Sequence, residues 1–318
     1  MQQIIGGFMW LINSVMALLK PKTTPKVECK DQQNPIIIEK PIEAIPTNEH
    51  SEIDWLQWTK KAASISSTFE GKGGDYANVT GNFDGAYLTC GLLGLTWKYG
   101  NQVKIIDEYL KLYGPNKLQK LMPKSGNEYL EAVNAGEQAG SSIVANWSHG
   151  SANVKEPYKS ELEAFWSSPE MVELQDKTYE KMMGVFAKKK CIETKDYFKN
   201  EVPKFEHYAY WWDQAVLNGT GKTIEFSDAI NVSIEDVLEF VRSVGGYNKS
   251  SNRENYKLWS LHINNMSEEK KHLFKMGYLR ALKSRDEFKG TTMMRRGTLA
   301  LGIGFVNLTL RKYEWFKS

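Results

Sequence analysis

Residues that build metal sites and disulfide frameworks are scarce in this chain of 318 residues. It holds three widely separated cysteines, an odd number, and no Cys-x-x-Cys pair. Its five histidines include no His-Glu-x-x-His spacing. We therefore expect no disulfide framework, no bound metal ion and no cofactor.

A long apolar run is also lacking. The apolar stretch at residues 4–19 is interrupted by two glycines, an asparagine and a serine, and a bilayer span needs about 20 residues. No basic residue precedes it, whereas a cleaved signal peptide normally begins with positive charge. We expect residues 1–20 to be either a weak membrane anchor or an apolar helix that docks into a partner protein.

Proline is rare outside one segment. Five of the ten prolines fall in residues 20–52, interspersed with lysine and glutamate. Such a composition stays extended and packs no core of its own. We therefore divide the chain into an apolar N-terminal helix (1–20), a proline-rich linker (21–52) and a catalytic domain (53–318).

The charge balance is mild. The net charge is +3, and residues 1–54 hold five lysines and seven acidic residues, so the remainder carries 36 basic and 31 acidic residues. This excess of positive charge is much smaller than in a nucleic-acid-binding domain. We therefore expect no nucleic-acid partner. A mildly basic surface suits an anionic polymer better than a polycation.

From residue 53 onward the pattern is helical. Apolar residues recur at helical spacing in 53–69 and 103–113, and long helices are expected within 127–147, 158–189 and 201–218. The sequence thus predicts a mainly α protein.

The last third of the chain shows two helix starts. Ser233 and Ser267 each precede acidic residues and then an apolar periodic run, which is typical of helix N-termini. A final helix is expected over 293–312, with the glycines at 302 and 304 as packing residues inside it. Strands are expected within 76–90.

Glu70 ends the first helical run and is followed directly by Gly-Lys-Gly-Gly. A helix that stops there would lift Glu70 toward a cleft, and the apolar neighbours Ile65 and Phe69 would raise the pKa of its carboxyl. Such a carboxyl can serve as a general acid. The alternative is a solvent-exposed glutamate at a helix C-terminus, a place that the helix dipole disfavours.

Asp84 lies in Asn-Phe-Asp-Gly, which by itself is typical of a turn. Thr89 follows five residues later, so a carboxylate and a hydroxyl could hold one water molecule together. Gly91 and Gly94, in the apolar run that follows, would let a helix pack closely against another element. These neighbours favour a general base over a simple turn residue.

Residues 65–101 resemble the catalytic region of the chitosanase branch of the lysozyme superfamily. The matching motif is DGAYLTCGLLGLT, residues 84–96, in which the Asp-to-Thr and Thr-to-Gly spacings agree with the family. The tyrosine is displaced by one position, and Ala86 replaces the family's arginine. The resemblance implies a two-lobed lysozyme-like helical fold with a small β-hairpin at the active-site cleft.

The resemblance also implies roles for three residues. Glu70 would protonate the leaving oxygen, Asp84 would take a proton from the attacking water, and Thr89 would orient that water. This is the inverting, two-carboxylate mechanism of glycoside hydrolysis.

Five further residues are candidate substrate contacts. Asp75 is a rival second carboxylate or a hairpin residue that shapes the cleft. Trp97 and Tyr99, just past the motif, could line a sugar subsite with Tyr87, although core packing is the alternative for Trp97. Asp213 lies in HYAYWWDQ (207–214), a predicted buried helix, where it faces the cleft or stabilises a buried arginine.

A chitosanase binds a polycation, and its cleft should be rich in carboxylates. Residues 65–101 offer only three acidic side chains before the motif ends, and the domain is net basic. We therefore expect a muramidase that cleaves bacterial peptidoglycan. The alternatives are a chitosanase and a non-enzymatic glycan-binding or structural virion protein with a lysozyme-like shell.

The N-terminal segment suggests a route of delivery. One hypothesis is a phage endolysin tethered to the membrane through residues 1–20; the other is a virion-associated lysin whose N-terminus docks into the injection machine. Either would act in the bacterial cell envelope or periplasm.

Overall fold

The computed structural model describes residues 53–70, 75–82, 85–148, 151–221 and 223–317. The expected N-terminal helix and proline-rich linker lie outside these ranges. The α-helices are α2 (Trp55–Ser67), α3 (Asn101–Tyr113), α4 (Pro115–Leu121), α5 (Gly126–Ala145), α6 (Tyr158–Trp166), α7 (Pro169–Tyr179), α8 (Val185–Phe198), α9 (Phe205–Asn218), α10 (Ile234–Ser243), α11 (Lys249–His262), α12 (Glu268–Leu282) and α13 (Asp286–Leu301). No helix in the described ranges has the length and apolarity that crossing a bilayer requires.

Two small antiparallel sheets complete the fold. The first has the order β1 (Val79–Thr80), β2 (Thr89–Cys90) and β3 (Leu95–Thr96), and the second is a hairpin of β4 (Ile303–Val306) and β5 (Thr309–Lys312). The predicted strand region 76–90 contains β1 and β2, whereas β3 lies beyond it. The prediction of a mainly α protein is confirmed.

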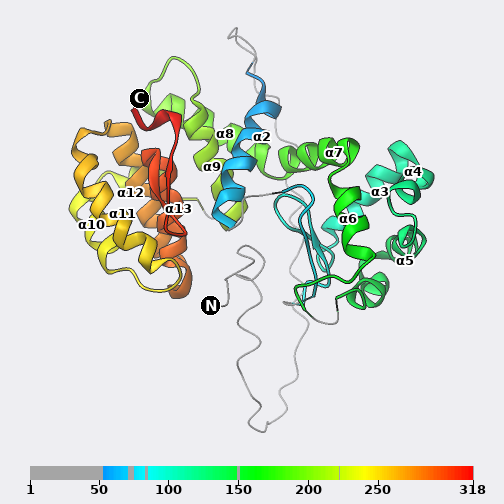
Figure 1. The fold of residues 1–318 in the computed structure, drawn as a ribbon. Coiled ribbons are helices and arrows are strands. Elements are labelled where there is room, and N and C mark those ends of the chain that lie inside the picture. Colours follow the sequence, from blue (N-terminus) through cyan, green and yellow to red (C-terminus); the bar gives the residue numbers. More distant parts are fainter. Residues whose placement is uncertain (1–52, 71–74, 83–84, 149–150, 222, 318) are drawn as a thin grey trace, which may run out of the picture.

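The elements form two lobes (Figure 1). The sheet lobe consists of β1–β3 with α3–α6, and the hairpin lobe consists of α8–α13 with β4 and β5. Helix α2 packs on α9 and also contacts α7, which runs from the centre into the sheet lobe. The two-lobed arrangement agrees with the prediction.

Where the sequence predicted a long helix within 158–189, the structure has three consecutive helices, α6, α7 and α8, which connect the two lobes. The helical run breaks at Ser167-Ser168, because Pro169 cannot donate a helical hydrogen bond and restricts the residue before it. From there α7 passes through a π-turn at Glu180–Gly184 directly into α8.

The two predicted helix starts are confirmed. The Ser233 hydroxyl accepts a hydrogen bond from the Asp236 amide, and the Ser267 hydroxyl accepts one from the Lys270 amide. Each cap satisfies one of the amides that the first turn leaves without a helical partner. The buried helix over 207–214 is confirmed as part of α9, in which every residue from His207 to Val216 is buried.

The prediction of a final helix over 293–312 is wrong beyond Leu301. Gly302 adopts φ +75°, a left-handed conformation that ends α13, and the chain then turns back as the β4–β5 hairpin. The glycines at 302 and 304 are therefore a helix cap and a strand residue. A Cβ at Gly304 would lie 2.1 Å from the Thr298 hydroxyl oxygen, so the strand packs directly on α13.

A half-buried carboxylate, Glu269, links α12 to the start of α9. Glu269 accepts hydrogen bonds from His207 Nε2 at 2.9 Å, from Asn200 Nδ2 at 2.5 Å and from Lys204 Nζ at 2.5 Å. Burial raises the pKa of Glu269, but these partners outweigh it and hold the pKa at about 2.

This pKa shift predicts an acid-sensitive contribution to stability. The stabilisation should be complete above the unfolded-state pKa of about 4.3 and should disappear as the pH falls toward 2. We expect the free energy of unfolding to differ between wild type and Glu269→Gln above pH 5 and to converge near pH 2, as measured by urea denaturation. A difference that is constant over this range would contradict the assignment.

Candidate active site

Glu70 is the last residue of a 3-10 turn, η1 (Thr68–Glu70), that continues α2. Its side chain lies outside the part that the structure describes, but the turn before it is fixed. The Ser66 hydroxyl donates to Asp213 Oδ1 at 2.6 Å, and the guanidinium of Arg295 lies 4.9 Å from the centre of the Phe69 ring. The backbone of Glu70 is therefore anchored against the hairpin lobe.

Phe83 and Asp84 lie outside the described residues, whereas both flanks of Asp84 are held in place. The Asn82 amide donates to Ser148 Oγ at 2.9 Å, and the Tyr87 amide donates to Asn82 Oδ1 at 2.9 Å. The Ala86 carbonyl accepts from the amides of Leu88 and Lys98. The loop that carries Asp84 thus starts and ends on the sheet lobe.

Thr89 lies on the central strand, β2, opposite Thr80 on one side and Thr96 on the other. Its side chain is 8% exposed, and its Oγ1 has no hydrogen-bond partner among the described residues. A buried hydroxyl without a partner costs free energy, and such a group in a native structure calls for an explanation.

The motif glycines that follow Thr89 form a turn between β2 and β3, not a helix. Gly91 and Gly94 adopt φ +84° and +66°. A Cβ at Gly91 would lie 2.4 Å from Gln175 Oε1, so α7 packs against this turn. The expectation of a helix in this apolar run is therefore wrong, although α7 does pack closely against Gly91.

The segment before β1 is hydrogen-bonded to helix α7. The sequence analysis did not predict this contact. Tyr76 donates its hydroxyl hydrogen to Asp176 Oδ1 of α7 at 2.6 Å, and Lys60 Nζ of α2 lies 3.5 Å from Asp176 Oδ2. Burial and the Asp176 carboxylate raise the pKa of Tyr76 well above its usual value. Asp176 therefore joins α2, α7 and the start of the sheet.

Three predicted substrate contacts lie at or near the surface of the sheet lobe. Asp75 is exposed, and its Oδ1 accepts from the Ala77 amide at 2.9 Å, which is a turn contact. Tyr87 is half-buried with φ +68°, and Tyr99 is 42% exposed.

Two predicted substrate contacts lie in the core, which corrects the expectation for both. Trp97 is fully buried against Tyr129 and donates Nε1–H to the Glu137 carbonyl at 2.9 Å, so neither ring face is open to a sugar. Asp213 is fully buried as well and forms ion pairs with Arg295 and Arg296. This is the buried-arginine role that the sequence left open.

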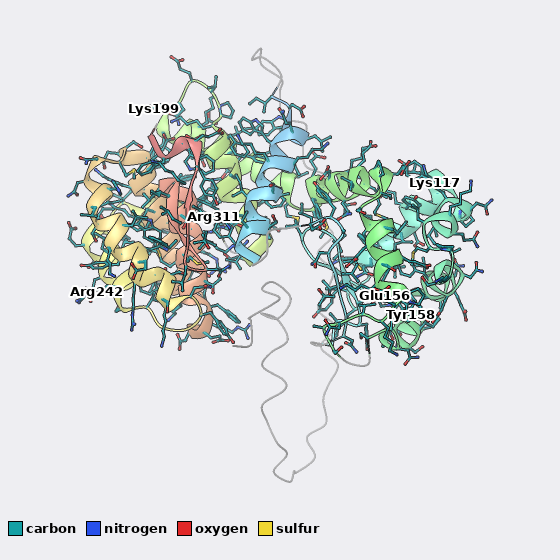
Figure 2. The ribbon with its side chains drawn as sticks, in the orientation of Figure 1. Lys117, Glu156, Tyr158, Lys199, Arg242 and Arg311 are labelled. Carbon is teal, nitrogen blue, oxygen red and sulfur yellow. The ribbon has the colours of Figure 1, made fainter. Side chains whose placement is uncertain are left out.

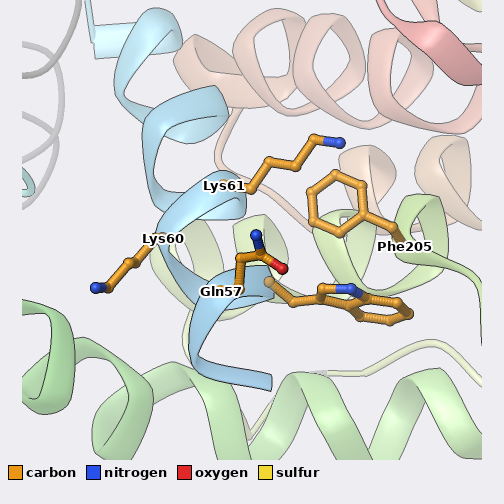
Figure 3. Close-up of a pocket in the computed structure, with 5 residues that line it drawn as sticks. Gln57, Lys60, Lys61 and Phe205 are labelled. Atoms are coloured by element: carbon orange, nitrogen blue, oxygen red, sulfur yellow. The ribbon is translucent and has the colours of Figure 1, made fainter. Parts of the chain in front are cut away.

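Three surface hollows lie away from these residues. Figure 3 shows one of about 360 Å³ beside the first turns of α2, lined by Gln57, Trp58, Lys60, Lys61 and Phe205. The Lys61 ammonium lies 4.5 Å from the centre of the Phe205 ring and pairs with Glu314. The others lie at the start of α13 and between α9 and α12.

Comparison with known proteins gives few matches. No protein-family model and no curated protein matches the chain. Two solved structures are similar to it, a native chitosanase from Bacillus subtilis and a mutant of that chitosanase complexed with 6 GlcN. Both are 17% identical with a TM-score of 0.39, and the matches cover 78% and 79% of this chain and 88% of theirs. A TM-score of 0.39 is below the level that structures of one fold share.

The buried ion cluster predicts a large effect on folding. Asp213→Asn would leave two buried arginines without their counter-charge, and breaking a buried ion pair costs about 3–5 kcal/mol. Urea denaturation should show this loss. The matched control is Asp75→Asn, the same change at an exposed aspartate, which should cost less than about 1 kcal/mol. Equal effects of the two changes would contradict the role given to Asp213.

Proposed function

We propose that this chain is a glycoside hydrolase that cleaves the glycan strands of bacterial peptidoglycan by an inverting, two-carboxylate mechanism. In this proposal Glu70 is the general acid and Asp84 the general base. These two roles are assigned from the sequence motif. The positions of the residues around them support the assignment.

The observation that carries the proposal is the Thr89 hydroxyl. It is buried on the central strand and has no partner among the described residues, while the loop that holds Asp84 starts and ends beside the same sheet. A hydroxyl without a protein partner keeps its full hydrogen-bonding capacity, so a water molecule admitted beside it would be bound, and Asp84 could accept the proton of that water.

The two-lobed arrangement supports the acid's role. Glu70 ends a helix anchored to the hairpin lobe, whereas the Asp84 loop is anchored to the sheet lobe. An inverting enzyme needs its two carboxyls roughly 6.5–9.5 Å apart to admit the attacking water. Placing them on opposite lobes lets the packing of α2 against α7 set that separation.

Charge favours an anionic glycan. The chain from residue 55 onward is net basic, with 36 basic and 31 acidic residues. The carboxylates of peptidoglycan would be attracted to such a surface, and the ammonium groups of chitosan would be repelled. Delivery from a phage, through a membrane tether or a virion contact of residues 1–20, belongs to the same proposal.

The decisive experiment compares two substrates. We expect wild type to release reducing sugars from purified peptidoglycan and to produce the anomer of inverted configuration in an NMR time course. Glu70→Gln and Asp84→Asn should each lower the rate by at least about 10²- to 10⁴-fold while the protein stays folded. Release from chitosan in place of peptidoglycan would make the chain a chitosanase, and no release from either would favour a glycan-binding protein.

Thr89→Val should separate catalysis from folding. The variant removes a buried hydroxyl without a described partner, so the free energy of unfolding should stay constant or rise by about 1 kcal/mol. Turnover should nevertheless fall by at least about tenfold, because the water loses its orienting group.

The matched control is Thr298→Val in α13, where the hydroxyl is also buried without a described partner. It should show the same effect on stability with unchanged turnover. Equal turnover in the two valine variants would remove Thr89 from the mechanism.

A further inference from the structure

We propose that the tip of the β4–β5 hairpin, residues 307–310, is a substrate subsite beside Glu70 that takes the N-acetyl group of a peptidoglycan sugar. This inference rests on the proposed function and names the sugar chemistry that the site selects.

The turn of the hairpin has an unusual residue at its second position. Val306 pairs with Thr309, so Asn307 and Leu308 form a two-residue loop, and their φ angles are +49° and +64°. Loops with two positive φ angles strongly prefer Asn-Gly. A left-handed conformation is unfavourable for a residue with a Cβ, so Leu308 holds it against its backbone preference.

Packing does not compensate for this strain. The Leu308 side chain is 61% exposed, and that of Leu310 is 49% exposed. The backbone is held from outside the hairpin, because the Leu308 amide donates to Ser251 Oγ at 3.0 Å. Strain at an exposed side chain points to a role in binding, since local strain concentrates at functional positions.

The tip lies beside the end of η1. Asn307 Nδ2 donates to the carbonyl of Phe69, the residue before Glu70, at 3.5 Å. Figure 2 places Arg311 on the hairpin near the same end of α2. A sugar whose glycosidic oxygen receives a proton from Glu70 would therefore have the tip within reach of its substituents.

The side chains at the tip define the ligand. Leu308 and Leu310 present exposed apolar surface, which suits the methyl group of an N-acetyl substituent. The free ammonium of a de-N-acetylated sugar offers no such methyl group.

The test is Leu308→Gly in the full chain. Glycine suits the turn, so the melting temperature should stay constant or rise. The KM for peptidoglycan should rise about 5- to 30-fold with kcat little changed, and the KM for chemically de-N-acetylated glycan strands should stay within about twofold. The matched control is Leu261→Ala on α11, which removes a leucine side chain that is 75% exposed and should change neither KM.

The outcomes separate this inference from the proposed function. An unchanged KM for peptidoglycan in Leu308→Gly, or an equal rise for both glycans, would overturn the subsite. If wild type hydrolyses neither glycan, the proposed function fails, and co-sedimentation with insoluble peptidoglycan then tests the tip alone. Weaker sedimentation of Leu308→Gly than of Leu261→Ala would support the subsite, and equal sedimentation would overturn it.

Discussion

The buried contact between Asp213 and two arginines is the constraint on which the candidate site depends. Asp213 belongs to α9, Arg295 and Arg296 belong to α13, and Ser66 of α2 donates to the same carboxylate. Charges in the interior need partners, so these three helices cannot separate without exposing an unpaired ion to a medium that solvates it poorly. The helix that ends in Glu70 is fixed by electrostatics as well as by apolar packing.

Asp176 has a comparable role on the other side of α2. It binds Lys60 of α2 and Tyr76 of the sheet lobe from α7. Helix α2 is therefore held from two directions, by Asp213 toward the hairpin lobe and by Asp176 toward the sheet lobe. These two carboxylates, neither of which belongs to the proposed acid–base pair, therefore hold α2 between the two lobes.

Local patterns in the sequence predicted most of the helices and both serine caps, because periodicity and capping are short-range properties. The sequence analysis did not predict the C-terminal hairpin. Residues Ile303–Val306 are as apolar as the buried face of a helix, and the sequence alone does not show that Gly302 adopts a left-handed backbone conformation. The roles of Trp97 and Asp213 depended on burial, a property of the whole fold. The assignments of Glu70 and Asp84 come from the motif and stay predictions.

The hairpin also leaves the protein with an open strand edge. Among the residues that the structure describes, strand β5 pairs with β4 alone, and three of its four residues are exposed. Such an edge can recruit a strand from a second molecule, and charged side chains are a common defence against this. Arg311 and Lys312 carry that charge here. Neutralising both would therefore invite self-association, which means that sequence change in this strand is limited by solubility as well as by any contact with substrate.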